Sequence, residues 1–408
     1  MRQPVPVHEP ISTAPHWREQ LIASLAALPT ERHRRIRTFR PGGSAASLQD
    51  AHANGTPLLD LASNDYLGLA RHPALARAAT ACLNEEGLGA GSSRLVCGSR
   101  PIHEALERAL AHWLGRERVL LFPSGFQANL AAVTALADRH SLVLADRLIH
   151  HSLLVGVQAS GARLQRFRHN DLRDLDRRLL AARQADPGRR LLVLSESLFS
   201  MEGTSPPVEA LARLCGRHGA LLLLDEAHAL GVLGQGGRGL AWGLPAVTLV
   251  SGTFGKAFGG GGAFLASDEL VGDWLLQRSG GFRYTTALAP PLAAGALAAL
   301  ELLKNREASG QEAGPALLER ARRWRDGLAA AGWPRPAGHG PILALLVGDD
   351  QGALDLQARL EAAGLLSVAI RPPTVPEGQA RLRLVLREDL PSGSLRRLLA
   401  ALGSPPAP

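Results

Sequence analysis

Lysine is almost absent from this chain, which has 408 residues and draws its basic charge from arginine. Lys256 and Lys304 are the two lysines among 45 lysine and arginine residues. Lys256 lies between glycines and small residues in Ser251–Gly259, where an amine can lose its proton and form a Schiff base, which arginine cannot do. The segment alone is also typical of a surface lysine in a glycine-rich loop, so the choice depends on the rest of the chain.

Cysteine and long apolar runs are scarce as well. Cys82, Cys97 and Cys215 are odd in number and form no CxxC pair, which argues against a zinc or disulfide framework and for a reducing compartment. The N-terminus lacks the apolar core of a signal peptide, and no apolar run approaches the roughly 18 residues of a membrane span. We therefore expect a cytoplasmic protein that does not enter a membrane.

Aromatic residues make up only 4% of the chain, although its formal net charge is +8. Proteins that bind single-stranded nucleic acid stack bases on aromatic side chains, and here the arginines alternate with acids, as in residues 173–178. We therefore do not expect nucleic-acid binding. A basic surface suits an anionic substrate instead.

Hydrophobic residues at 46% and charged residues at 20% are typical of a globular enzyme, and the length predicts more than one substructure. We divide the chain into an N-terminal segment over 1–57 with a short helix, a large domain over 58–288 and a smaller α+β domain over 289–408. Several apolar runs of the large domain are continuous, as a mostly parallel sheet covered by helices on both faces requires. The predicted strands are 118–122, 142–145, 191–195, 221–224, 247–251 and 262–266, separated by helices at 101–114, 126–137, 172–183 and 207–217.

The smaller domain is predicted to begin with two long helices after Pro290-Pro291, which run to about Gly332. The elements expected after them are strand 342–347, helix 351–363, strand 365–370, strand 381–386 and helix 393–402. At the other end of the chain, apolar residues at helical spacing predict a short helix over His16–Leu28.

Polar residues gather where the predicted strands end, and ligands bind beyond the carboxyl ends of strands in open parallel sheets. Asp225 follows a buried leucine strand, and such a carboxylate is costly unless a cation meets it. A protonated pyridine ring would supply that cation, with His228 near a ring substituent; a helix N-cap is the other interpretation of Asp225. Residues 225–228 also spell a helicase DEAH box, but Val250 and Ala257 break the phosphate-loop pattern that an ATPase needs.

Two further strand ends carry candidate ligand-binding groups. Ser124–Gln127 leads into a helix whose free N–H groups can hold a phosphate, with Thr253 as a possible hydroxyl donor, although a plain turn explains the segment equally well. His150 is either a stacking or acid–base histidine or a structural one. It is not expected to bind a metal, because no further His, Cys or carboxylate lies at metal-ligand spacing from His150 and His151. A lysine, a carboxylate, a histidine and phosphate-binding turns together match pyridoxal 5'-phosphate (PLP), an electron sink for a carbanion.

Five stretches resemble the α-oxoamine synthases, a family of fold-type-I PLP enzymes, and the resemblance covers about residues 17–402. They are Ser63–Leu69, Ser124–Phe126, Phe199–Gly203, Asp225–His228 and Thr253–Lys256. The resemblance implies a large PLP-binding domain with a mostly parallel seven-stranded sheet and a smaller α+β domain. It also implies a homodimer with active sites at the subunit interface.

Carried over position by position, the resemblance implies a role for each matching residue. Lys256 would form the Schiff base with PLP and move the substrate α-proton, Asp225 would keep the pyridine nitrogen protonated, and His150 would stack on the ring. Arg371 would pair bidentately with the substrate carboxylate. The other implied cofactor contacts are Gly125, Phe126, Ser200, His228 and Thr253, and the other implied substrate contacts are Asn64, His150, Thr374 and Arg34, with Arg37 as the alternative to Arg34.

Residues 370–376 and 380–384 resemble the biotin-pathway branch of the family, which condenses L-alanine with a pimeloyl thioester and releases carbon dioxide. The thiol carrier is either coenzyme A or an acyl-carrier protein. Ala229-Leu230 and Gly259–Gly262 depart from the expected pattern, so a glycine-using sister ligase is the main alternative. A catalytically silent binding subunit is a remoter one, because such a protein would be expected to lose the lysine or its carboxylate partner.

Overall fold

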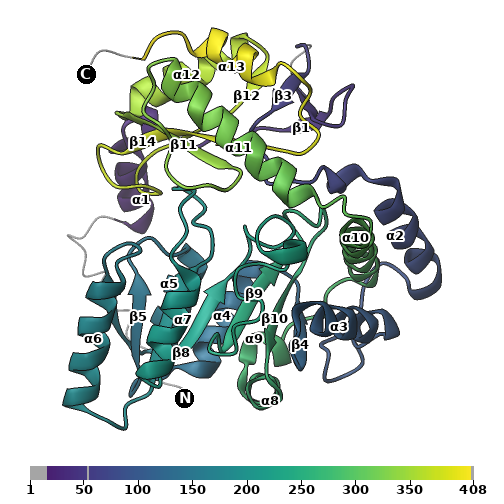
Figure 1. The fold of residues 1–408 in the computed structure, drawn as a ribbon, viewed down its shortest axis with the longest axis vertical. Helices are drawn as coiled ribbons and strands as arrows, with labels where there is room; N and C mark the ends of the chain where they lie inside the picture. The colour runs from purple at the N-terminus through teal and green to yellow at the C-terminus, as the bar shows by residue number, and fades with distance from the viewer. Residues whose placement is uncertain (1–15, 53–54, 406–408) are drawn as a thin grey trace, which may run out of the picture.

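The computed structural model describes residues 16–52 and 55–405, which build one part around a large sheet and a second part around two small sheets (Figure 1). The large sheet has seven strands in the order β4-β10-β9-β8-β7-β5-β6. Strand β10 runs antiparallel to both of its neighbours, and the other pairs are parallel. The strands are β4 (Arg118–Phe122), β5 (Leu142–Asp146), β6 (Arg163–Phe167), β7 (Leu191–Glu196), β8 (Leu221–Asp225), β9 (Leu249–Thr253) and β10 (Ala263–Ser267).

The predicted mostly parallel α/β sheet is confirmed, and six of its strands lie within two residues of the predicted runs. Most residues of these strands are buried, so their sequences contain apolar runs such as Val119–Phe122, Leu142–Ala145 and Leu191–Leu194. Strand β6 has no counterpart among the predictions. It lies at the edge of the sheet, where Arg163 and Arg166 are exposed to solvent and interrupt the apolar pattern.

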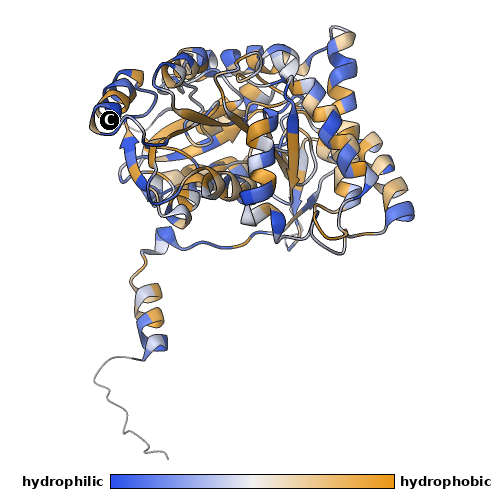
Figure 2. Cartoon of the chain, turned by 90° about the horizontal axis from the view of Figure 1, so that it is seen from below, coloured by the Kyte–Doolittle hydropathy of each residue, from blue (hydrophilic) through white to orange (hydrophobic). Residues whose placement is uncertain are grey.

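Helices cover both faces of this sheet. Alternate strand residues point to opposite sides, so that Leu192 and Leu223 pack with α4, α5, α8 and α9, whereas Val193 and Leu222 pack with α3, α6, α7 and α10. Figure 2 shows apolar residues concentrated on the strands between these helices. The helices of this part are α2 (Pro73–Glu86), α3 (Pro101–Leu114), α4 (Gly125–Leu136), α5 (His151–Ser160), α6 (Leu172–Ala185), α7 (Val208–Arg217), α8 (Glu269–Arg278), α9 (Gly280–Arg283) and α10 (Pro290–Ala308), with 3-10 turns η2 (Leu69–Arg71) and η3 (Gln235–Gly237).

The second part combines the C-terminal residues with the N-terminal strands (Figure 1). Its three-stranded sheet is antiparallel, in the order β11-β14-β13, and its four-stranded sheet has the order β1-β2-β3-β12. The predicted strand 365–370 is divided between the two, because Ser367 separates β12 from β13. The elements are η1 (Thr30–Arg32), β1 (Phe39–Pro41), β2 (Ser47–Asp50), β3 (Leu58–Asp60), α11 (Ala313–Ala330), β11 (Ile342–Gly348), α12 (Asp350–Ala362), β12 (Leu365–Leu366), β13 (Val368–Ile370), β14 (Ala380–Val385) and α13 (Ser394–Leu402).

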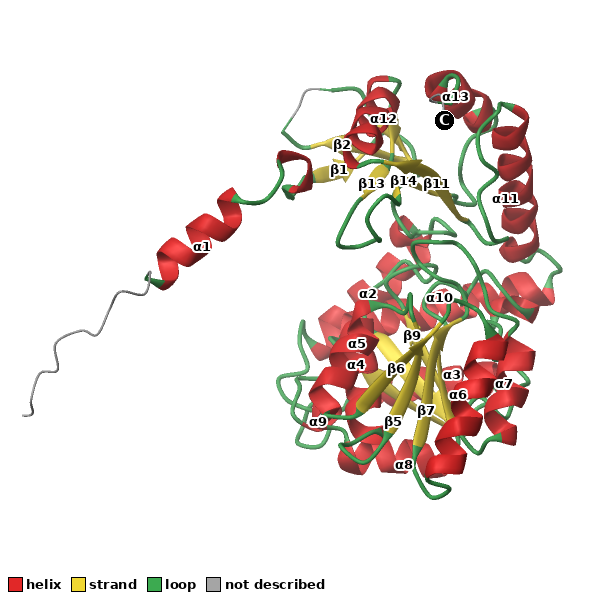
Figure 3. Ribbon diagram, turned by 90° about the vertical axis from the view of Figure 1, so that its left-hand side faces the viewer, coloured by secondary structure: helices red, strands yellow, loops and turns green. Residues whose placement is uncertain are grey.

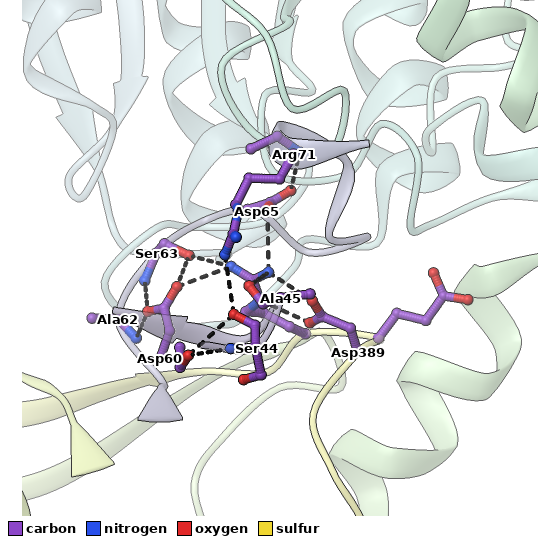
Figure 4. Close-up of polar contacts among 12 residues, drawn as sticks. Ser44, Ala45, Asp60, Ala62, Ser63, Asp65, Arg71 and Asp389 are labelled. Atoms are coloured by element: carbon purple, nitrogen blue, oxygen red, sulfur yellow. Dashed lines mark hydrogen bonds and ion pairs between the residues drawn. The ribbon is translucent and has the colours of Figure 1, made fainter. Parts of the chain in front are cut away.

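A buried arginine joins the N-terminal strands to the C-terminal residues. Arg387 donates to Asp60 at 2.9 Å and to Asp389 at 2.8 Å, and a nitrogen of its guanidinium lies 3.3 Å from Asp65 (Figure 4). Because the Arg387 side chain is only 5% exposed, these carboxylates balance a charge that burial would otherwise disfavour. Strand β3 pairs with β12 in the four-stranded sheet. The predicted domain boundary between residues 57 and 58 assigns β3 to the large domain and β12 to the smaller one, and this boundary stays a proposal.

Helix α1 (Trp17–Ala26) projects from the rest of the structure (Figure 3). Trp17, Leu21 and Leu25 share one face at helical spacing, as predicted, but each of them is more than half exposed. Within residues 16–52 and 55–405, no helix is both long and apolar enough to cross a membrane.

Candidate active site

A cavity of about 210 Å³, here called the inner cavity, lies at the carboxyl ends of β4, β5, β8 and β9. Seven of the predicted site residues line it: Gly125, Phe126, His150, Asp225, His228, Thr253 and Lys256. They come from loops that are up to about 130 positions apart in the sequence, and the parallel strand order brings them to one edge of the sheet.

Asp225 ends β8 and is 6% exposed. Its Oδ1 accepts the backbone N–H of Ala227 at 2.9 Å, and its Oδ2 accepts the side-chain N–H of Asn129 at 2.7 Å. Among the described residues, no cation forms an ion pair with this carboxylate. A buried carboxylate fixed by two neutral donors is ready to receive a cationic group of a ligand.

Asn129 also connects Asp225 to His150. Its side-chain nitrogen donates to Ser152 Oγ at 3.0 Å, and Ser152 Oγ lies 2.7 Å from His150 Nδ1. The backbone N–H of Ser152 donates to the same ring nitrogen, so Nδ1 is an acceptor and the proton of the neutral ring is on Nε2. Desolvation lowers the pKa of His150, which favours this neutral form. The network therefore fixes the orientation of the imidazole.

Lys256 lies in the loop after β9, and the pKa of its amine is lowered. Burial lowers the pKa of the amine to about 8, and the charges of Asp225 and Glu196 oppose this shift. Glu196 accepts the backbone N–H of His150 at 2.6 Å. Burial, assisted by the negative charge of Asp225, raises the pKa of Glu196 well above its usual value. A lysine with a lowered pKa supplies the unprotonated amine that imine chemistry needs.

His228 lies on a chain of polar contacts that reaches the C-terminal residues. Its Nδ1 is 2.6 Å from the hydroxyl of Tyr66, and Asn64 Oδ1 accepts from the same hydroxyl at 3.4 Å and from Arg383 at 2.9 Å. Burial lowers the pKa of His228 well below its usual value, with the charges of Lys256 and Arg383 adding to the effect. His228 is therefore neutral.

The N-terminus of α4 supplies an anion-binding turn. Ser124 caps the helix, and its Oγ accepts the N–H of Gln127 at 3.3 Å. The first-turn N–H groups of Gly125 and Phe126 have no partner within the helix, and both residues line the inner cavity. The Thr253 hydroxyl donates to the carbonyl of Gly262 at 3.0 Å, so it also holds its own loop together.

A second and larger cavity of about 730 Å³, here called the outer cavity, adjoins the inner one and shares His150 with it. Ser200, Thr374 and Arg34 line the outer cavity, and Arg34 donates to Thr374 Oγ1 at 3.3 Å. Arg37, the alternative to Arg34, instead pairs with Glu361 at 2.6 Å. Ser200, which the resemblance implied as a cofactor contact, thus lines the outer cavity and is not among the residues that line the inner one.

Two predicted substrate contacts line neither cavity. Arg371 donates to the backbone carbonyl of Glu31, and Asn64 contacts Arg383 and Tyr66 behind His228. Arg383, which the sequence interpretation did not single out, is 6% exposed and donates to the carbonyl of Ser200 at 2.7 Å. No carboxylate of a described residue forms an ion pair with it.

Asn129 and Glu196 were also missed as site residues. Both are on regular elements, α4 and β7, whose sequences read as apolar core. A buried amide and a buried carboxylate in such segments are the available signal, because each needs a polar partner. Arg383 gave a weaker signal, since it alternates with apolar residues in β14.

The chain matches the family model of class I and II aminotransferases over residues 56–402. This match covers most of the sequence and includes all the residues of the inner cavity. The fold and the site together define a PLP-dependent transferase of this class, and the predicted cofactor is the one that the class uses.

The relatives identify the branch. An 8-amino-7-oxononanoate synthase of Gluconacetobacter diazotrophicus is 45% identical over 86% of this chain and 88% of its own length. Among solved structures, a Sphingomonas wittichii serine palmitoyltransferase has a TM-score of 0.84 at 29% identity, covering 94% of this chain and 96% of that one. An 8-amino-7-oxononanoate synthase from Francisella tularensis has a TM-score of 0.72 at 26% identity, covering 85% and 96%. The chain belongs to the class I and II aminotransferase family, and its relatives within that family are 8-amino-7-oxononanoate synthases.

The residues present fit PLP. The inner cavity offers a lysine of lowered pKa for the aldehyde, an unpaired buried carboxylate for a pyridinium and free helix N–H groups for a phosphate. A pyridinium phosphate aldehyde would use all three groups. The donor set of this chain is therefore consistent with the cofactor of its family.

Proposed function

We propose that the protein condenses L-alanine with a pimeloyl thioester to give 8-amino-7-oxononanoate, carbon dioxide and the free thiol, in the biotin pathway. The new bond joins the alanine α-carbon to the thioester carbonyl carbon, and the alanine carboxylate leaves as carbon dioxide. The observation that carries this proposal is the inner cavity, where a lysine of lowered pKa and an unpaired buried carboxylate line the same space. The 45% identity to a synthase of this name supports the choice of substrates.

Each side chain of the inner cavity has a definite task in this proposal. PLP, when bound, supplies an electron sink for the carbanion. Lys256 binds the cofactor and then removes and returns the proton on the substrate α-carbon, which its lowered pKa favours near neutral pH. With the cofactor bound, Asp225 would keep a proton on the ring nitrogen, His150 would stack on the ring face, and His228 would lie close to a ring oxygen.

The substrate carboxylate needs a cation, and we assign that task to Arg383 in place of Arg371. Arg383 is buried, and its guanidinium donates to neutral oxygens of Ser200 and Asn64 and also interacts with the hydroxyl of Tyr66. Burial lowers its pKa, which marks a charge without a counter-ion. Its charge also lowers the pKa of Lys256, so it acts at short range on the inner cavity. Arg371 already donates a hydrogen bond to the backbone carbonyl of Glu31, so we prefer Arg383 as the partner of the substrate carboxylate.

The acyl chain belongs in the outer cavity. That cavity adjoins the inner one at His150, and apolar side chains such as Leu148, Leu154 and Val375 line it. We propose that Arg34 and Thr374, which are hydrogen-bonded to each other, contact the acyl donor there. The donor is carried by coenzyme A or by an acyl-carrier protein, both of which are anionic.

Serine palmitoyltransferase activity is the second candidate, because a solved enzyme of that name has the higher TM-score, 0.84 against 0.72. The test measures thiol release by the PLP-loaded protein with alanine, glycine or serine, each paired with pimeloyl-CoA or palmitoyl-CoA. We expect release and a product of the mass of 8-amino-7-oxononanoate with alanine and pimeloyl-CoA. Turnover of serine with palmitoyl-CoA alone would replace the proposal, and turnover of glycine with a short acyl donor would indicate the sister ligase.

We also propose a homodimer that works in the cytoplasm. The side chains of Leu88, Val96 and Tyr284 are 77%, 77% and 78% exposed, and α1 also exposes large apolar side chains. Burial against a second copy of the chain would remove this apolar surface from water. The next residues, Thr285-Thr286, would then be close to the partner's phosphate group. Light scattering of the purified protein tests the dimer, and a monomer with full activity would contradict it.

A further inference from the structure

We propose that Arg147 and Arg166 form a binding site for the phosphate of the phosphopantetheine arm that carries the acyl donor. Both side chains line the outer cavity, Arg147 from the residue after β5 and Arg166 from the edge strand β6. The inference rests on the proposed use of a thioester donor. It adds the place where the carrier, as distinct from the acyl group, is recognised.

The two guanidinium groups are available for a ligand. No hydrogen bond, ion pair or ring contact within residues 16–52 and 55–405 involves either side chain. By contrast, Arg168, which directly follows β6, pairs with Asp171 at 2.7 Å, and Arg32, two residues before Arg34, pairs with Asp350 and Glu377. Unpaired arginines that converge on one cavity are suited to bidentate recognition of phosphate.

The charge of the outer cavity favours an anion. Arg34, Arg147 and Arg166 are on its wall, whereas Glu202 is its single acidic lining residue. Glu202 forms an ion pair with Arg381 at 3.3 Å, and burial raises its pKa. The acid therefore does little to offset the three arginines, and the cavity presents a positive field to an incoming ligand.

The sheet geometry separates this site from the reacting carbon by the length of the carrier arm. Asp225 ends β8, and β5 and β6, which lead to Arg147 and carry Arg166, lie two and three strands away from it. With strands about 4.8 Å apart, the lateral separation is about 10 Å for Arg147 and about 14 Å for Arg166. An extended chain covers about 1.2 Å per bond, so the roughly thirteen bonds from thiol to phosphate span about 15 Å. The roughly six bonds of the pimeloyl chain span only about 7 Å, so its carboxylate is too close to the reacting carbon to reach this site.

The first experiment measures binding without turnover. Calorimetry of the PLP-loaded protein compares 4'-phosphopantetheine with pantetheine, which differ by one phosphate. We expect the wild-type protein to bind the phosphorylated form about tenfold more tightly or better, and the R147Q/R166Q variant to bind both forms equally. Arg163→Gln is the matched control, because Arg163 is exposed on β6 and does not line the outer cavity. Equal affinities in the wild-type protein would overturn the proposal.

The second experiment compares KM values for three donors: pimeloyl-CoA, pimeloyl-pantetheine without phosphate, and heptanoyl-CoA without the terminal carboxylate. The R147Q/R166Q variant should raise KM about tenfold or more for both CoA thioesters and leave that for pimeloyl-pantetheine and for L-alanine unchanged. A KM rise confined to the two pimeloyl donors would assign the arginines to the acyl carboxylate and overturn the proposal. If no pimeloyl donor is turned over at all, the proposed function fails, while the binding experiment still decides the phosphate site.

Discussion

Asn129→Ala tests whether the amide that joins Asp225 to His150 positions the cofactor-binding carboxylate. The bond from Asn129 to Asp225 is 2.7 Å long, and hydrogen bonds to charged groups contribute about 1.5–3 kcal/mol. If that free energy is lost from the positioning of Asp225, PLP affinity falls about 10- to 100-fold, since about 1.4 kcal/mol corresponds to a factor of ten. The substitution also removes the bond from Asn129 to the Ser152 hydroxyl that contacts the His150 ring, which should lower kcat.

The same substitution should cost a moderate amount of stability. Removing the side chain removes the unsatisfied acceptor Asn129 Oδ1, but it also leaves the buried Asp225 Oδ2 without its donor. We expect the free energy of unfolding of the apo protein to fall by about 1–3 kcal/mol. A 10- to 100-fold loss of PLP affinity in a variant that still folds assigns a positioning role to Asn129.

PLP affinity is measured by absorbance titration of the apo protein, and stability by chemical denaturation of the same preparation. Asn129→Asp should weaken affinity further, because it places a second carboxylate beside Asp225. Asn305→Ala, on the exposed side of α10, is the control. An affinity within twofold of the wild type in Asn129→Ala would refute the reasoning.

Three further outcomes are expected. Lys256→Ala should abolish steady-state turnover with the fold intact by circular dichroism, and appreciable turnover would contradict the role of the amine. Because burial lowers the pKa of Lys256 to about 8, the cost of burying its charge is present below that pH and disappears as the pH rises toward the model-peptide value of 10.5. The apo protein should therefore gain stability over this alkaline range, and Lys256→Met should lose that gain in denaturant titrations at several pH values. Arg387→Ala should lower the free energy of unfolding by about 3–5 kcal/mol, because it leaves Asp60 and its neighbouring carboxylates buried without a cation; a loss below about 1 kcal/mol would refute this.

The strands of the large sheet could be predicted from the sequence because burial on both faces requires continuous apolar runs. Leu221–Asp225 is an example: four leucines followed by a carboxylate indicate a buried strand with a functional end. Edge strand β6 could not be predicted in this way, since one side of it meets solvent and tolerates arginine. The division of 365–370 between two sheets was equally hidden, because local pattern does not show which partner a strand pairs with.

Some residues of the candidate site could likewise be identified from the sequence, and others only from tertiary contacts. Lys256 and Asp225 could be singled out from their neighbours in the sequence, and the structure brings both to the inner cavity. The resemblance implied Arg371 as the partner of the substrate carboxylate, and the sequence interpretation did not single out Arg383. Only the tertiary contacts distinguish them: one is held by a backbone carbonyl and the other is buried without a counter-ion.

The sequence by itself determined the class of fold, the chemistry-bearing motifs and the family, because these depend on residue type and on spacing along the chain. The tertiary structure decided which groups meet. It joined Asn129 of α4 to Asp225 and His150, brought Arg383 of the second part behind His228, and left Arg147 and Arg166 unpaired at the outer cavity. These contacts depend on strand order and on packing between distant segments, which no local pattern encodes.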